Sequence, residues 1–132
     1  IRMYSEKRKF GNLGEEVGVS FLKKRGFAIL DRNYLYKVGE IDIVAKYKSV
    51  LHFIEVKTVR FVDSAEVSRE SDSFRPEENI HPEKLKKISR AIVLYLEDTG
   101  KGEETWIFDA LIVKIDEANK TARVKFIEDI NI

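Results

Sequence analysis

The fold is decided by the stretch GEIDIVAKYKSVLHFIEVK, which runs from Gly39 to Lys57. Two runs rich in Ile, Val and Phe flank the polar pair Lys48-Ser49, a pattern typical of two antiparallel strands joined by a tight turn. If the turn is centred between Lys48 and Ser49, Val44 faces Phe53 across the two strands. The stretch therefore predicts a β-hairpin with a defined register.

In the same register Asp42 faces Glu55 on one side of the sheet, and the Cβ atoms of such a pair lie about 4.5–5.5 Å apart. The period of two along a strand also places Leu51, Phe53, Glu55 and Lys57 on one face. Charged residues thus occupy the end of a face whose other members are apolar. Selection for stability alone would rarely choose this arrangement.

Outward from this hairpin, the rest of the chain predicts two helices and three further strands. Helix end signals and apolar spacing indicate a helix over 11–26 and a second one from Pro82 to just before Gly100. The long polar stretch over 59–79 is expected to be a mobile loop. The extended runs cover 27–36, 40–47, 50–58, 106–115 and 122–127, the first three as an antiparallel meander. We expect an α/β or α+β fold, a mixed sheet of about five strands flanked by two main helices.

Composition limits the function classes. The 132 residues, of which 43% are hydrophobic, are enough for one compact core, so we expect a single domain over 1–132. Because 24 Lys+Arg nearly balance 23 Asp+Glu, any phosphate-binding surface must be a local patch. The absence of cysteine excludes disulfides and thiolate metal ligands. No secretory signal and no apolar run near the roughly 20 residues of a membrane span are found, so a cytoplasmic protein without membrane contact is expected.

Asp42 and Glu55 indicate a metal-dependent hydrolytic site. Two opposed carboxylates repel each other, so a positive group should lie between them. Lys57 supplies part of this charge, and a hard divalent cation supplies more, because Mg²⁺ prefers carboxylate, water and phosphate oxygens. Such an ion would polarise a phosphodiester and acidify a bound water, while Lys57 orients that water or offsets charge on the phosphate.

A simpler alternative is that Glu55 and Lys57 form a solvated ion pair, which any half-exposed strand offers. Glu40 is either a further ligand through water or an edge charge, and the sequence leaves both readings open. His52 and His81 have no partner at metal-ligand spacing. We interpret His52 as a strand residue that faces away from the acidic pair, and His81 as a residue of the turn before the second helix.

The motifs together resemble the Asp…Glu-x-Lys signature of the restriction-endonuclease-like, or PD-(D/E)xK, superfamily, and more closely its YraN-like family. The resemblance covers most of the chain in order and spacing. It rests on Gly11-x-x-Gly14-Glu15, Arg32-Asn33, Gly39-Glu40-Ile41-Asp42, Phe53-Ile54-Glu55-Val56-Lys57, Lys84 and Phe108-Asp109.

This resemblance implies a restriction-endonuclease-like core with catalytic Asp42, Glu55 and Lys57 and with Mg²⁺ or Mn²⁺ as the cofactor. The chain is also similar to archaeal Holliday-junction resolvases, in which a glutamate on the first helix completes the site. Glu15 is the matching position and is expected as a catalytic and metal-binding residue, although an acidic residue near a helix N-terminus is also explained by the helix dipole. The 59–79 stretch is longer and more acidic than is usual in this family.

The leading hypothesis is a metal-dependent endonuclease that cuts DNA, with branched DNA suggested by analogy only. Arg32, Lys84 and Lys87 are the basic residues expected to contact nucleic acid, although a solvated helix face also explains the two lysines. One alternative is a non-catalytic nucleic-acid or protein-binding module that retains the nuclease fold. Another is a nuclease that needs a partner to order the 59–79 loop. A homodimer that cuts both strands is compatible with the sequence.

Overall fold

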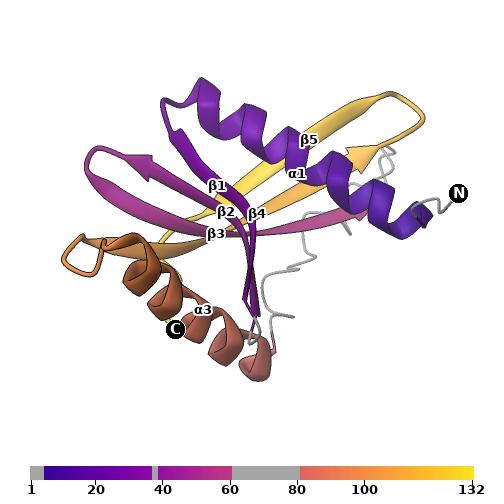
Figure 1. Ribbon diagram of the computed structural model, residues 1–132. Helices are drawn as coiled ribbons and strands as arrows, with labels where there is room; N and C mark the ends of the chain where they lie inside the picture. The colour runs from indigo at the N-terminus through magenta and orange to yellow at the C-terminus, as the bar shows by residue number, and fades with distance from the viewer. Residues whose placement is uncertain (1–4, 37–38, 61–80) are drawn as a thin grey trace, which may run out of the picture.

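A computed structural model describes residues 5–36, 39–60 and 81–132 and shows two helices and five strands in these ranges (Figure 1). The polar segment 61–80 lies outside the described residues, so the expected mobility of the 59–79 loop stays a prediction. In chain order the elements are α1 (Glu6–Lys24), β1 (Ala28–Tyr36), β2 (Gly39–Tyr47), β3 (Val50–Arg60), α3 (Pro82–Thr99), β4 (Trp106–Asp116) and β5 (Thr121–Ile127).

The five strands form one mixed sheet in the order β1-β2-β3-β4-β5. Neighbouring strands are antiparallel except β3 and β4, which run parallel from Leu51↔Trp106 to Arg60↔Ile115. A parallel pair needs a crossover, and the segment containing α3 provides it. The predicted meander of the first three strands and the mixed sheet are both confirmed.

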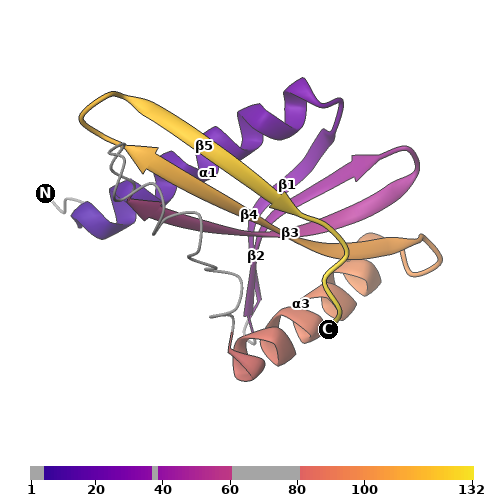
Figure 2. The same ribbon diagram turned by 180° about the vertical axis from the view of Figure 1, so that it is seen from behind.

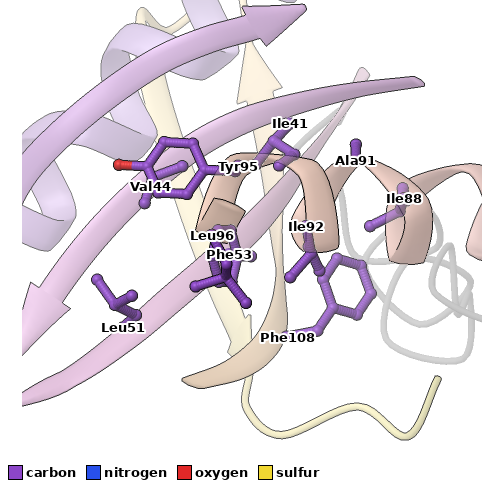
Figure 3. Packing of buried hydrophobic residues seen from close by; sticks show 10 residues of the cluster. All are labelled: Ile41, Val44, Leu51, Phe53, Ile88, Ala91, Ile92, Tyr95, Leu96 and Phe108. Atoms are coloured by element: carbon purple, nitrogen blue, oxygen red, sulfur yellow. The ribbon is translucent and has the colours of Figure 1, made fainter. Parts of the chain in front are cut away.

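The two helices cover opposite faces of the sheet, as both views of the molecule show (Figures 1 and 2). On one face, α3 contributes Ile92 and Tyr95 to a buried cluster that also contains Phe53 and Phe108 of the sheet (Figure 3). On the other face, Leu22 of α1 packs with sheet residues that include Ile43, Ala45, Ile54 and Leu111. Burial on both faces explains why the strand runs are almost continuously apolar.

Some predicted boundaries are wrong by a few residues. α1 begins at Glu6 rather than Gly11, because the side chain of Ser5 caps it by accepting a hydrogen bond from the Arg8 N–H at 3.2 Å. The residues from Glu6 to Lys9 carry no apolar period, so the sequence pattern does not reveal this first turn. β3 continues to Arg60, two residues into the predicted loop, since β4 still pairs with it there.

The second helix agrees with its sequence signals. His81 is the N-cap, as expected for a residue of the preceding turn, and its side chain accepts a hydrogen bond from the Glu83 N–H. Pro82 occupies the first turn, and Gly100 ends the helix in the left-handed region at φ 68°. Among the described helices, neither is long and apolar enough to cross a membrane.

Candidate active-site cleft

β2 and β3 separate at the acidic residues. The predicted register is confirmed for Val44↔Phe53, and the paired residues end at Ile43↔Ile54. Just beyond this last pair, the Val56 N–H of β3 donates to the side-chain Oδ2 of Asp42 on β2 at 2.8 Å. A side chain thus replaces a backbone hydrogen bond between the two strands. Asp42 and Glu55 therefore approach each other beyond the end of the ladder rather than as a pair within it.

β2 also changes its facing at Asp42. Ile41 belongs to the cluster under α3, whereas Ile43 belongs to the cluster under α1, although a regular strand would place both on one face. The hydrophobic pattern around Asp42 thus breaks the period of two. This local turn places the Asp42 carboxylate where the two strands part.

The opening between the strands is a cleft with a volume of about 1030 Å³. Its walls come from the first half of α1, from β1, β2 and β3, and from the start of α3. Five acidic and five basic side chains line it: Glu15, Glu16, Glu40, Asp42 and Glu55 against Lys7, Arg8, Arg32, Lys57 and Lys84. Glu15 and Glu55 are buried and form the floor, whereas Lys7, Arg8 and Lys84 are exposed at the entrance together with Glu16 and Glu40.

Burial and the repulsion from Glu55 disfavour the ionised form of Asp42 when no divalent cation is bound. Burial, followed by the negative charge of Glu55, raises the pKa of Asp42 from 3.8 to about 8. The hydrogen bond from the Val56 N–H opposes this shift but does not cancel it. At neutral pH Asp42 therefore favours its protonated form in the metal-free protein.

Glu15 is held by two residues of β1. Its Oε1 accepts hydrogen bonds from Arg32 Nε and Nη2, both at 3.3 Å, and from Asn33 Nδ2 at 2.9 Å. Burial raises the pKa of Glu15, and the contacts with Arg32 and Asn33 partly offset this. Every one of these bonds ends on the same oxygen. Arg32, which we expected to contact nucleic acid, also pairs with Glu16 at 2.7 Å.

Asn33 adopts φ 52°, a left-handed conformation that asparagine tolerates better than most residues. Its neighbours Arg32 and Tyr34 pair with Ile43 and Ile41 of β2, so Asn33 lies opposite Asp42. Asn33, Asp42 and Glu55 thus form a row across three strands. The amide of Asn33 links this row to Glu15 on α1.

Gly14 brings Glu15 close to the sheet. A Cβ atom at position 14 would overlap the side chain of Thr58 on β3, so only glycine allows α1 to approach this closely. The predicted Gly-x-x-Gly-Glu motif therefore has a packing reason in its second glycine. A Cβ atom at Gly11 would meet open space, so packing does not require glycine at this position.

Lys84 and Lys57 supply positive charge beside the acidic pair. Lys84 Nζ lies 2.5 Å from Glu55 Oε1. Lys57 lines the same cleft, as expected from its position two residues after Glu55. Glu40 also lines the cleft, and its charge acts on Glu15 and on Asp42. Lys87 is exposed on α3 and is not among the lining residues.

His52 has a partner that sequence reasoning missed. Its Nδ1 lies 2.6 Å from Asp109 Oδ2, and the pair is buried on strands β3 and β4. Asp109 Oδ1 accepts from the Asp129 N–H at 2.9 Å, so the pair also holds the chain after β5. His52 does not line the cleft. Its expected separation from the acidic pair is confirmed, and Asp109 has a structural role.

The donor set suits a hard cation with few protein ligands. Within residues 5–36, 39–60 and 81–132, no three acidic or histidine side chains gather closely enough to hold a metal ion. Asp42 and Glu55 would therefore be the two carboxylates for such an ion, with water and phosphate oxygens completing the shell. This is the coordination that Mg²⁺ accepts most readily. Glu15, tied to β1, could reach the shell through water.

Comparison with known proteins places this architecture in a family. Residues 14–115 match the model described as "Uncharacterised protein family UPF0102". The chain belongs to the UPF0102 family. A UPF0102 protein of Desulfosudis oleivorans is 40% identical over 113 residues, which cover 85% of this chain and 84% of that protein. A UPF0102 protein of Sulfurovum sp. is 37% identical and covers 93% of this chain and 94% of its own length.

A UPF0102 protein of Helicobacter hepaticus is 41% identical over 81% of this chain and 86% of its own length. The matched range includes Glu15, Asp42, Glu55, Lys57 and Lys84, so the whole set of candidate site residues lies inside the UPF0102 region. Family membership agrees with the YraN-like resemblance drawn from the sequence.

Proposed function

We propose that this UPF0102 protein is a divalent-metal-dependent endonuclease of the restriction-endonuclease-like superfamily that hydrolyses DNA phosphodiester bonds. The observation that carries the proposal is the pair of half-buried Asp42 and buried Glu55 at the point where β2 and β3 part, with Lys57 beside it in an open cleft. Two adjacent carboxylates repel each other when both are ionised, which destabilises the fold unless a cation binds between them.

Each side chain has a distinct task in this proposal. Asp42 and Glu55 hold Mg²⁺ or Mn²⁺, which when bound supplies Lewis-acid activation of the phosphate and acidification of a water. Lys57 orients the attacking water or offsets negative charge that develops on the phosphate. Glu15, fixed by Arg32 and Asn33, faces the cleft as a third acidic group that positions water near the reacting phosphate.

The distribution of charge supports a phosphate substrate. The entrance carries the exposed bases Lys7, Arg8 and Lys84, whereas the buried floor carries Glu15 and Glu55. A polyanion would meet positive charge first, which offsets the repulsion from the floor. Lys84 and Lys87 lie one turn apart on α3, so Lys87 would extend a phosphate contact beyond the cleft.

One observation favours a second candidate, a nucleic-acid-binding or protein-binding module without catalysis. Glu55 already has a cationic partner in Lys84, as in a purely structural charge network. In that case Asp42, Glu55 and Lys84 would stabilise the fold around the cleft, and no metal would be needed.

The deciding experiment is a cleavage panel with Mg²⁺ or Mn²⁺ on duplex, single-stranded, flap and four-way-junction DNA. Wild type and Asp42→Asn are purified in parallel, with Glu103→Gln, an exposed acid away from the cleft, as the matched control. We expect cleavage by wild type and Glu103→Gln and none by Asp42→Asn. Equal cleavage by wild type and Asp42→Asn would remove this site from consideration. DNA binding without cleavage would favour the second candidate.

A further inference from the structure

Lys84 has an unusual position for a lysine. It is the third residue of α3, where the helix dipole disfavours a positive charge. Its ammonium instead contacts Glu55 at 2.5 Å, and its side chain is 52% exposed whereas that of Glu55 is 8% exposed. The reason for a lysine at this position is therefore the acidic floor of the cleft, not the helix.

Lys84 responds to the whole acidic group rather than to Glu55 alone. Its ammonium contacts Glu55 and lies in the cleft that Asp42 and Glu40 also line. The ammonium therefore stays charged. It provides the positive charge beside Glu55 when no metal is bound.

We propose that Lys84 is a built-in competitor of the divalent cation, neutralising Glu55 in the metal-free protein and moving to the cleft entrance when the ion binds. The inference rests on the metal site of the proposed function. Two cations cannot both contact Glu55 without strong mutual repulsion. The flexible four-carbon stem and the half-exposed side chain of Lys84 permit the movement.

This exchange gives Lys84 a second use. Once displaced, its ammonium joins Lys7 and Arg8 at the entrance, where a substrate phosphate would pass. Metal binding would then create a phosphate contact that the metal-free protein lacks. A lysine that kept its contact with Glu55 in the metal-bound protein would provide no such additional phosphate contact.

The test is calorimetric titration of Mg²⁺ and Mn²⁺ into DNA-free protein. Lys84→Met keeps the apolar stem and removes the charge. Lys86→Met is the matched control, because Lys86 is exposed on the same helix, lies outside the cleft lining and pairs with Glu83 at 3.9 Å. We expect Lys84→Met to bind the ions roughly tenfold more tightly than wild type and to melt at lower temperature without metal. Lys86→Met should resemble wild type in both measurements.

Asp42→Asn shows which binding belongs to the site. If Lys84→Met binds with wild-type affinity or more weakly, while Asp42→Asn abolishes binding, the competition is wrong and the metal site stands. If Asp42→Asn binds the ions as well as wild type and Lys84→Met do, the proposed metal site is wrong, and the proposed competition is wrong as well. Should Lys84→Met prove too unstable to titrate, the rise in Tm with increasing Mg²⁺ in Lys84→Gln provides the same comparison.

Discussion

Asp42 accepts a hydrogen bond from the backbone N–H of Val56 at 2.8 Å, at the position where β2 stops pairing with β3. The carboxylate thus has a structural duty as well as its proposed chemical one. It satisfies a backbone donor that the parting strands would otherwise leave without a partner. Because the two duties need different properties of the side chain, different substitutions separate them.

Asp42→Asn should keep the metal-free fold at wild-type stability or above. An amide oxygen still accepts from Val56, and the repulsion between Asp42 and Glu55 is gone. Asp42→Ala should instead cost about 1–3 kcal/mol, because the Val56 N–H loses its acceptor. Denaturant unfolding of both variants without metal checks this. Equal destabilisation by Asn and Ala would mean that the negative charge itself stabilises the fold.

The metal-free protein should lose stability as the pH rises from about 4 to about 8. Over this window Asp42 is protonated in the folded state, with a pKa of about 8, but ionised in the unfolded state, with a pKa of 3.8. The folded state therefore binds more protons, so raising the pH favours unfolding, by up to about 1.4 kcal/mol per pH unit. Melting curves at several pH values in EDTA measure this slope.

Asp42→Asn is the control for that slope, which it should flatten across the same window. Mg²⁺ should restore stability most strongly near pH 8, because a metal ion binds the ionised carboxylates. A wild-type Tm that rises steadily from pH 4 to pH 8 in EDTA would contradict a protonated Asp42 in the folded protein.

The hairpin and its register were predictable because the information is local. The turn at Lys48 and Ser49 takes positive φ values of 46° and 67°, and the flanking apolar alternation leaves one register that buries Val44 and Phe53. Neighbouring residues on these strands then bring Asp42, Glu55 and Lys57 to one cleft. Local patterns thus predicted the sheet and the centre of the candidate site.

Contacts between distant elements were not predictable in the same way. Residues 57 positions apart form the His52–Asp109 pair, which exists only because β4 pairs with β3 in parallel. The hold of Arg32 and Asn33 on Glu15 likewise depends on how closely α1 docks, and Gly14 sets that distance. Except for His52, these residues belong to motifs visible in the sequence, but their roles arise from tertiary packing.

The contacts to Glu15 give a separable prediction for Asn33. Asn33→Gly keeps the left-handed backbone at φ 52° and removes only the donor to Glu15. We expect the turnover of Asn33→Gly to fall about tenfold, because a hydrogen bond to a charged group is worth about 1.5–3 kcal/mol. The free energy of unfolding should change little, because water can replace part of the lost bond. DNA cleavage rates and denaturant unfolding measure the two effects.

Asn33→Ala should lose the same turnover and, in addition, about 1 kcal/mol of stability, because alanine strains at positive φ. Arg32→Gln tests the other contact and should also lower turnover. If Asn33→Gly retains the wild-type rate while Asn33→Ala is only less stable, the asparagine serves the backbone alone. The two hydrogen bonds from Arg32 would then be enough to hold Glu15.

Lys57 separates catalysis from binding. It lies two residues after Glu55 on β3 and lines the same cleft, whereas Lys84 is the residue that contacts Glu55 directly. Lys57→Ala therefore leaves both carboxylates and their present counter-ion in place. The metal should still bind, and more tightly, because a positive neighbour is gone. DNA should bind nearly as before, since one ammonium is a small part of a footprint over several phosphates.

Turnover of Lys57→Ala should nevertheless fall by at least about a hundredfold, because the lost charge acts mainly in the transition state. Single-turnover cleavage, metal titration and DNA binding on the same preparation distinguish the steps, with Lys86→Ala as an exposed lysine control on α3. Cleavage at the wild-type rate together with a lower melting temperature would make Lys57 a structural counter-ion of the acidic pair. The charge network would then serve the fold, and the binding-module function would explain the cleft better than hydrolysis does.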